Sequence, residues 1–272
     1  MGHSTITATT GLCAIIGNPI EHSLSPLIHN AAFKYLSLEY VFLAFKVEHL
    51  EEAVKGIRRL NLKGVSVTIP HKVEIMEYLD DVEEVAGKIG AVNTVVNREG
   101  RLTGYNTDCG GAIKALEEKM ELKDKKTMLL GAGGSARAIA FGLKEKGAEI
   151  IILNRTVKKA EMLALELDCQ YGGLELVETL KPDILVNTTS LGMHPHVDDM
   201  PVRKEFLKDM LVFDIVYNPL KTRLITEAEQ NGCETILGLE MFLNQAALQF
   251  KLWTEKDAPL ELMRKVVLEE LS

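Results

Sequence analysis

The chain has 272 residues, enough for about two domains at roughly 150 residues per domain, and 46% of them are hydrophobic. A chain of this composition can bury a large core, which excludes a disordered or low-complexity protein. The formal net charge of −8 argues against a nucleic-acid partner and against a surface that binds anionic lipid.

The first half of the chain alternates short β-branched runs with longer helical patterns. Strands are predicted at Leu12–Gly17, Tyr40–Phe45 and Gly64–Val67, and helices at Pro26–Leu36 and His49–Leu60. Such alternation predicts a mainly parallel sheet with helices on both faces. A hairpin is predicted next, with strands at Val92–Asn97 and Leu102–Tyr105. Asp108 is then expected to cap a helix that runs to about Met120.

A second alternating series starts at Lys126. Its predicted strands are Thr127–Leu130, Glu149–Leu153, Ile184–Asn187, Leu211–Asp214 and Glu234–Leu237. Its predicted helices are Ser135–Lys146, Val157–Leu167 and Thr222–Asn231. The tail after residue 238 is predicted to be helical, with Pro259 separating two helices.

These elements predict an α/β fold of two domains. Because the helical tail follows a complete Rossmann series and has no strand of its own, we expect it to pack on the first domain. Residues 1–110 plus 239–272 would form a discontinuous α/β sandwich that binds substrate, and residues 111–238 a Rossmann domain. A cleft would separate the two domains.

A glycine-rich turn joins the first strand of the second series to its helix. Its residues are Gly131, Ala132, Gly133, Gly134, Ser135 and Ala136, which give the pattern G-x-G-x-x-A. In dinucleotide-binding folds the first glycine permits the turn, and the second lets the backbone approach a pyrophosphate. The last small residue lets the helix pack on the strand. A strand, this turn and a helix in succession favour a dinucleotide site over a merely structural turn.

The end of the next strand indicates which dinucleotide binds. NAD enzymes usually place an Asp or Glu there to accept the ribose 2′-hydroxyl. This chain has Asn154, Arg155 and Thr156, followed by Lys158 and Lys159. A guanidinium can hold a 2′-phosphate with two hydrogen bonds, and cations that open a helix otherwise oppose its dipole. The segment therefore predicts NADP(H) as the coenzyme.

Three polar clusters follow predicted strands of the first domain. They are His22–Pro26, Thr68–Lys72 and Asn106–Asp108. Ligands of open α/β sheets bind beyond the strand ends, and carbonyl reduction by a nicotinamide also needs a proton donor. Taken singly, each cluster has a purely structural interpretation: Ser23, Ser25 and Asp108 as helix caps, and Lys72 as a surface lysine.

Nine motifs follow one another along the chain. They are Gly17–Pro26, Val67–Lys72, Gly90–Thr94, Gly104–Asp108, the glycine turn, Asn154–Thr156, Asn187–Gly192, Asp214–Pro219 and Gly238–Met241 with Gln245. In this order they resemble the shikimate dehydrogenase family. One departure is Ser66, where the family usually has Asn. A hydroxyl can replace one hydrogen bond of the amide but not both.

The resemblance implies a reaction and a set of site residues. Shikimate dehydrogenases reduce 3-dehydroshikimate reversibly to shikimate with NADPH, in the pathway to chorismate and aromatic amino acids. Lys72 would be the acid/base, with Asp108 beside it. Substrate would also contact Ser23, Ser25, Thr68, Asn93, Tyr217 and Gln245. Ile215 and Gly238 would border the nicotinamide.

Two alternative functions stay open from the sequence. One is a quinate/shikimate dehydrogenase with broader substrate or NAD use. The other is a ligand sensor without catalysis, which the presence of both Lys72 and Asp108 disfavours. His194 and His196 lack a third ligand nearby in sequence, so no metal is expected.

Location and partners are predicted from simpler features. No segment approaches the roughly 20 apolar residues of a membrane span, and the polar Met1–Thr10 carries no secretion signal. The four cysteines lie far apart without a C-x-x-C pair, which predicts reduced thiols in the cytoplasm. The expected partner is a small molecule, and the resemblance leaves a homodimer open because relatives are commonly dimeric.

Overall fold

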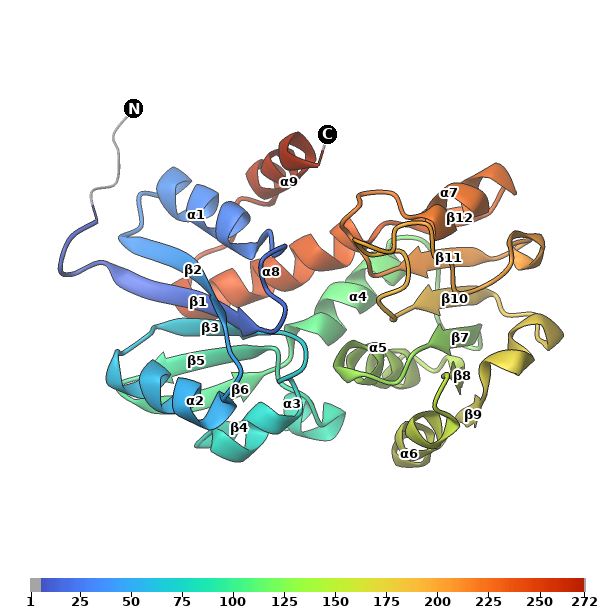
Figure 1. Cartoon of the computed structure of the whole chain (residues 1–272), viewed down its shortest axis with the longest axis horizontal. Helices are drawn as coiled ribbons and strands as arrows, with labels where there is room; N and C mark the ends of the chain where they lie inside the picture. Colours follow the sequence, from blue (N-terminus) through green and yellow to red (C-terminus); the bar gives the residue numbers. More distant parts are fainter. Residues whose placement is uncertain (1–5, 272) are drawn as a thin grey trace. The chain divides into compact units, whose positions relative to one another are not determined.

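The structure, a computed structural model, describes residues 6–271 (Figure 1). Met1–Thr5, half of the amino-terminal segment interpreted above, lie outside the described residues. The described chain forms two compact units, one of residues 6–107 with 245–270 and one of residues 108–244. Within residues 6–271, no helix is long and apolar enough to cross a membrane.

The first unit is built on a six-stranded sheet in the order β2-β1-β3-β5-β6-β4. Its strands are β1 (Gly11–Gly17), β2 (Tyr40–Lys46), β3 (Gly64–Val67), β4 (Asp81–Val82), β5 (Thr94–Arg98) and β6 (Arg101–Tyr105). The first three strands run parallel, and β5 is antiparallel to both β3 and β6. The predicted hairpin is confirmed, and both residues of its turn, Glu99 (φ 54°) and Gly100 (φ 89°), have the positive φ that two-residue hairpin turns favour.

Helices cover both faces of this sheet (Figure 1). They are α1 (Ser25–Tyr35), α2 (Leu50–Arg59), the 3-10 helix η1 (Glu74–Tyr78), α3 (Glu84–Ile89), the later part of α8 (Gly238–Thr254) and α9 (Leu260–Glu270). On one face, Val54 of α2 packs in a cluster with Val65 and Val95 of the sheet. On the other face, the rings of Phe33 in α1 and Phe250 in α8 have centroids 5.3 Å apart.

A histidine lies inside this aromatic layer. His29 of α1 is fully buried, and its ring stacks on Phe42 with centroids 4.6 Å apart. The ring of Trp253 lies 5.2 Å away. Burial lowers the pKa of the imidazole to about 3, so His29 is neutral in the folded protein near pH 7. His29 therefore fills the core as an aromatic ring rather than as a cation.

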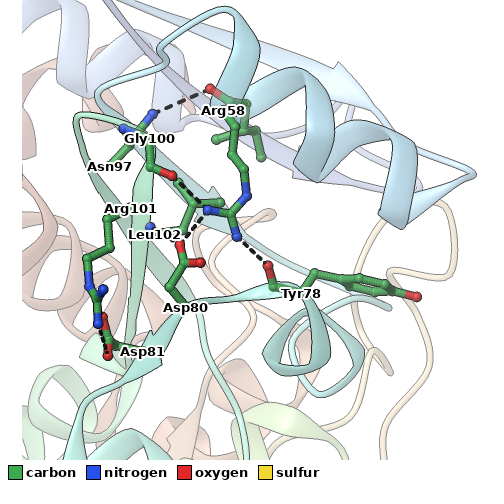
Figure 2. A network of polar contacts seen from close by, with 9 residues as sticks. Arg58, Tyr78, Asp80, Asp81, Asn97, Gly100, Arg101 and Leu102 are labelled. Atoms are coloured by element: carbon green, nitrogen blue, oxygen red, sulfur yellow. Dashed lines mark hydrogen bonds and ion pairs between the residues drawn. The ribbon is translucent and has the colours of Figure 1, made fainter.

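An arginine of α2 holds the turn end of the hairpin (Figure 2). Arg58 donates hydrogen bonds to the carbonyl oxygens of Gly100 (2.7 Å) and Tyr78 (2.9 Å) and pairs with the carboxylate of Asp80. Asp80 also accepts from the backbone N–H of Leu102 (2.7 Å). The Arg58 and Leu102 hydrogen bonds hold the pKa of Asp80 below its ordinary value. The network ties α2 and the segment before β4 to the hairpin.

The second unit is built on a parallel six-stranded sheet in the order β12-β11-β10-β7-β8-β9. Its strands are β7 (Lys126–Leu130), β8 (Glu149–Leu153), β9 (Gln170–Gly172), β10 (Ile184–Asn187), β11 (Leu211–Asp214) and β12 (Glu234–Ile236). The predicted Rossmann series is confirmed. The strand order reverses between β8 and β10 at β7, and open α/β sheets bind ligands beside such a reversal.

Helices also cover this second sheet. They are α4 (Thr107–Glu117), α5 (Gly134–Glu145), α6 (Val157–Leu167), α7 (Arg223–Gln230) and the 3-10 helices η2 (Leu174–Thr179) and η3 (Lys204–Phe206). Ile139 of α5 and Leu163 of α6 pack in one cluster with Ile152 of β8. Leu224 of α7 packs in a second cluster with Val212 of β11.

Some local predictions are wrong. Asp108 does not cap α4, because the helix begins at Thr107 and Asp108 lies in its first turn. A carboxylate in that turn still complements the positive end of the helix dipole. The N-cap of α1 is Leu24, which makes no side-chain cap bond, so neither Ser23 nor Ser25 is that cap. The sequence also gave no sign of β4 and β9, which have only two and three residues.

Candidate active site

In the first unit, Ser23 and Ser25 lie where the chain leads from β1 into α1. The N–H of Ser23 donates to the carbonyl of Ile20 (3.0 Å), and its Oγ accepts from the N–H of Ser25 (3.3 Å). Ser25 is buried and is the first residue of α1. Two hydroxyl groups at the amino-terminal end of a helix suit a carboxylate ligand.

The segment after β3 carries Thr68 and Lys72. The carbonyl of Thr68 accepts from the N–H of His71 (3.0 Å), which gives this segment a tight turn. The half-buried Lys72 accepts, through its carbonyl, a hydrogen bond from the N–H of Val92 (2.7 Å). The backbone of Lys72 is therefore tied to the residue that directly precedes Asn93.

Asn93 is held by hydrogen bonds at both ends of its side-chain amide. Its Oδ1 accepts from the N–H of Thr107 (2.8 Å) and from Oγ1 of Thr94 (2.8 Å), and its Nδ2 donates to Oγ1 of Thr107 (2.9 Å). Asn93, Thr94 and Thr107 are all buried. Asp108 follows Thr107 directly, is also buried, and belongs to the second unit.

The register of the sheet brings these segments to one edge. Ile16 pairs with Val67, and Ser66 pairs with Thr94, so the carboxyl ends of β1 and β3 meet the start of antiparallel β5. A Cβ at Gly17 would lie only 2.4 Å from the methyl carbon of Thr68, so the end of β1 passes too close to Thr68 for a larger residue.

Gln245 and Gln249 lie one helical turn apart on the part of α8 that packs in this unit. Both are buried. Oε1 of Gln249 accepts from Oγ of Ser66 (2.7 Å), and its Nε2 donates to Oγ1 of Thr94 (3.0 Å). The residue that departs from the family pattern, Ser66, is thus bonded to Gln249.

In the second unit, the turn after β7 has a backbone suited to a diphosphate. Gly131 has φ +111°, and a Cβ there would lie 2.5 Å from Oγ1 of Thr188, so the position requires glycine. A Cβ at the exposed Gly133 would meet nothing within 4 Å, so space beside it is open. Helix α5 starts at Gly134 without an acidic residue in its first turn, and Ala136 is fully buried. The positive end of the α5 dipole therefore suits an anion.

The end of β8 presents basic residues without a carboxylate. Nδ2 of Asn154 donates to the carbonyl of Thr156 (2.9 Å), which fixes the turn around the exposed Arg155. Lys158 is exposed and pairs with Glu161 (2.9 Å). An exposed guanidinium at this strand end fits a 2′-phosphate, and the side chain of Asn154 is already used inside the turn.

The residues predicted to border the nicotinamide lie together in the second unit. A Cβ at Gly238 would lie 2.6 Å from the carbonyl carbon of Ile215 and 2.4 Å from the carbonyl oxygen of Val216. The two segments therefore touch through their backbones, which requires glycine at this position. The ring of Tyr217 stacks on Phe242 with centroids 4.3 Å apart.

A buried carboxylate supports the neighbouring strand ends. Asp214 at the end of β11 accepts from Oγ1 of Thr222 (2.7 Å), Nδ2 of Asn187 (3.0 Å) and the N–H of Val216 (3.1 Å). Burial raises the pKa of Asp214 to about 6, although these three hydrogen bonds oppose the shift. Asp214 thereby ties β10 and β11 to the start of α7.

Three family models match the chain. Residues 15–95 match the shikimate dehydrogenase substrate binding domain, and residues 114–219 match shikimate / quinate 5-dehydrogenase. Residues 238–268 match the shikimate 5′-dehydrogenase C-terminal domain. The chain belongs to the shikimate dehydrogenase family. The motif order in the sequence predicted this family correctly.

Similar shikimate dehydrogenases align over nearly their whole length. The shikimate dehydrogenase (NADP(+)) of Methanothermobacter thermautotrophicus is 46% identical over 95% of this chain and 96% of the relative. A crystal structure of a shikimate dehydrogenase in complex with NADP+ has a TM-score of 0.94 and 44% identity, covering 99% of this chain and 98% of that one. The Thermus thermophilus enzyme, crystallised with NADP(H) and shikimate, has a TM-score of 0.87 and 37% identity, covering 95% and 99%.

Two residues that hold this site had no role in the sequence analysis. Thr107 lies inside the motif Gly104–Asp108, yet only the structure shows that it bonds both ends of the Asn93 amide. Gln249 could have been noticed from its spacing of four residues after Gln245. Within residues 6–271, no group of three His, Cys, Asp or Glu side chains could hold a metal ion.

Proposed function

We propose that this chain is an NADP-dependent shikimate dehydrogenase, which reduces the 3-keto group of 3-dehydroshikimate to the hydroxyl of shikimate, reversibly. The observation that carries the proposal is the polar edge of the first unit. There the half-buried Lys72 is tied through Val92 to the rigid Asn93, in a chain of this family.

The polar residues of the first unit suit a polyhydroxylated carboxylic acid. Ser23 and Ser25 would hold the substrate carboxylate at the start of α1. Thr68, Asn93 and Gln245 would bond the ring hydroxyls. The remaining proposed substrate ligands, Asp108 and Tyr217, belong to the second unit.

Lys72 is the proton donor of the proposed mechanism. When bound, NADPH supplies the hydride that reaches the carbonyl carbon. The π electrons of the C=O bond move to the oxygen, and the Lys72 ammonium gives that oxygen its proton, so no alkoxide is released. In the reverse direction the neutral amine of Lys72 takes the hydroxyl proton. Asp108 is the second catalytic residue, hydrogen-bonding the substrate next to the reacting carbon.

The second unit fits NADP(H). The backbone from Gly131 to Ser135, including Ala132 and Gly134, would cradle the diphosphate at the start of α5. Arg155 would hold the 2′-phosphate, with Asn154 and Thr156 shaping the turn and Lys158 and Lys159 adding positive charge. Ile215 and Gly238 would border the nicotinamide.

The cytoplasmic location and the homodimer also belong to the proposal. None of the four cysteines forms a disulfide within residues 6–271, which suits a reducing compartment. The homodimer rests on the family resemblance alone. Sedimentation equilibrium of the purified protein measures its oligomeric state in solution.

The direct test is coenzyme oxidation followed by absorbance. We expect NADPH to be consumed only when 3-dehydroshikimate is added, and NADP+ to be reduced when shikimate is added. Parallel assays with NAD+ and with quinate measure how far the enzyme departs from strict specificity. A purified, folded chain that turns over neither shikimate nor 3-dehydroshikimate would contradict the proposal.

A further inference from the structure

We propose that Gln249 is a positioning residue for the substrate site, which fixes Asn93 through Thr94. Gln249 lies on α8 and is 2% exposed, so its amide must find its partners inside the protein. The inference rests on the proposed function, because it treats Asn93 as a ligand of shikimate.

The hydrogen bonds around Gln249 form a chain with one direction. Oγ of Ser66 donates to Oε1 of Gln249 (2.7 Å), and Nε2 of Gln249 donates to Oγ1 of Thr94 (3.0 Å). A hydroxyl has a single hydrogen to donate, and Oγ1 of Thr94 directs its own to Oδ1 of Asn93 (2.8 Å). Nε2 of Gln249 also approaches the carbonyl oxygen of Asn93 (3.3 Å). Each of these hydrogen bonds is therefore donated in the direction of Asn93. The series starts at Ser66 on β3 and passes through Gln249 on α8.

This series of hydrogen bonds determines which side-chain atom of Asn93 can bond the substrate. An amide oxygen has two lone pairs, and Oδ1 of Asn93 accepts from both Thr94 and the N–H of Thr107 (2.8 Å). A hydrogen bond from Asn93 to shikimate must then come from Nδ2, as a donor. Gln249 supports this orientation twice, through the hydroxyl of Thr94 and through the Asn93 backbone.

The same series of hydrogen bonds also gives Ser66 a role, as the donor to Gln249. Ser66 is 4% exposed and stands on β3, two residues before Thr68. Its hydroxyl hydrogen goes to Gln249, so Ser66 is not a hydrogen-bond donor to the substrate. Ser66 and Gln249 therefore both support Asn93, which bonds the substrate in the proposed function.

The test measures steady-state constants for Gln249→Met, which keeps the side-chain length and removes both polar ends. We expect the KM for shikimate to rise about fivefold, the scale of one lost hydrogen bond, while kcat and the KM for NADP+ change less than twofold. Thr94→Val should give the same split, and Ser66→Ala a smaller rise. In an Asn93→Ala background, Gln249→Met should raise the KM no further, because its effect passes through Asn93.

Trp253→Phe is the matched control for lost core stability. It lies on the same helix and removes one buried hydrogen bond, from Nε1 to the carbonyl of Val95 (3.1 Å), and we expect an unchanged KM for shikimate. An unchanged KM in Gln249→Met, or an additive effect in the Asn93→Ala background, would overturn the positioning role while the wild type remained active. If Gln249→Met does not fold, Ser66→Ala takes its place. An unchanged KM for shikimate, or an additive effect in the Asn93→Ala background, would then overturn the positioning role. A wild type inactive with shikimate would overturn the proposed function, and this inference with it.

Discussion

The two candidate binding regions are built in opposite ways. In the first unit, Asn93, Thr94 and Thr107 are buried and hold one another by hydrogen bonds. At the end of β8 in the second unit, Arg155 and Lys158 are exposed, and the backbone provides the shape of the glycine turn. Side-chain hydrogen bonds determine the shape of the first region, and the backbone determines the shape of the second.

Because of this difference, substitutions in the two regions should affect ligand affinity and the free energy of unfolding to different extents. A substitution within a buried network leaves unpaired polar groups behind, so it changes both binding and the free energy of unfolding. Replacing an exposed side chain that contacts only the ligand changes binding and leaves stability nearly intact. Recognition of the ring hydroxyls should therefore tolerate fewer changes than recognition of the coenzyme phosphate.

Lys72→Met tests the chemistry of the first region and has the largest expected effect. We expect kcat to fall by ~10²-fold or more, the usual scale for a lost general acid. Because Lys72 is only half-buried, the melting temperature should change little. Steady-state kinetics in both directions measure the loss. A variant that keeps more than a tenth of the wild-type kcat at saturating substrate would exclude Lys72 as the proton donor.

Acid should weaken the first unit, through His29. The pKa of this imidazole is 6.5 when exposed and about 3 when folded, so below pH 6.5 only the unfolded chain takes up the proton. Stability of the first unit therefore falls as the pH drops from about 6.5 toward 3, by about 2 kcal/mol near pH 5. Denaturant unfolding followed by the fluorescence of Trp253, the single tryptophan, reports on this unit. In His29→Phe the acid-dependent loss should disappear.

Asp214, in the second unit, should contribute to the pH dependence of stability with the opposite sign. Its pKa is 3.8 when exposed and about 6 when folded, so between these values the folded state takes up the proton first. The contribution of Asp214 to stability is therefore present at low pH and is lost as the pH rises through about 6. Hydrogen exchange resolved by unit at pH 7 and pH 5 compares the two. In Asp214→Asn this gain toward low pH should disappear, and a variant whose second unit keeps the wild-type pH dependence would contradict the assignment.

Arg155→Ala tests the exposed region. We expect the KM for NADP+ to rise tenfold or more, because a charge-assisted hydrogen bond contributes about 1.5–3 kcal/mol and ~1.4 kcal/mol is one decade. The KM for NAD+ should move much less, since NAD+ lacks the 2′-phosphate, and the melting temperature should stay unchanged. Equal losses toward both coenzymes would instead indicate stacking on the adenine.

Lys158→Ala should have the smallest effect. Lys158 is exposed and already paired with Glu161, and such surface charges are screened by salt. We expect the KM for NADP+ to rise at most about twofold at low ionic strength, and not at all at high salt. A rise as large as that of Arg155→Ala would place the 2′-phosphate against α6 instead.

The sequence predicted most of the fold because its signals are local. Short apolar and β-branched runs located β3, β8, β10 and β11 at their observed bounds. β4 has only two residues, and β9 has three without a β-branched side chain among them, so neither carries a strand signal. Their existence depends on neighbouring strands rather than on their own residues.

The candidate site also has residues that the sequence predicted and contacts that only the structure shows. Residue identity and motif order indicated Asn93 and Arg155, since amides and guanidinium groups suit their ligands. The bond between Ser66 and Gln249 joins residues 183 positions apart, and no local pattern indicates such a pair. Likewise, only the packed aromatic layer shows that His29 is neutral and buried.

The discontinuity of the first unit has a consequence for synthesis on the ribosome. Residues 108–244 are contiguous and can fold as soon as they emerge, whereas residues 6–107 lack α9 and most of α8 until the residues after 244 have been synthesised. At about 5–20 residues per second, the nascent sheet would wait on the order of ten seconds for Trp253 to cover Phe42. During that interval its uncovered aromatic face is a target for chaperones and for aggregation. The carboxyl-terminal helices thus set the time at which the first unit can complete its folding.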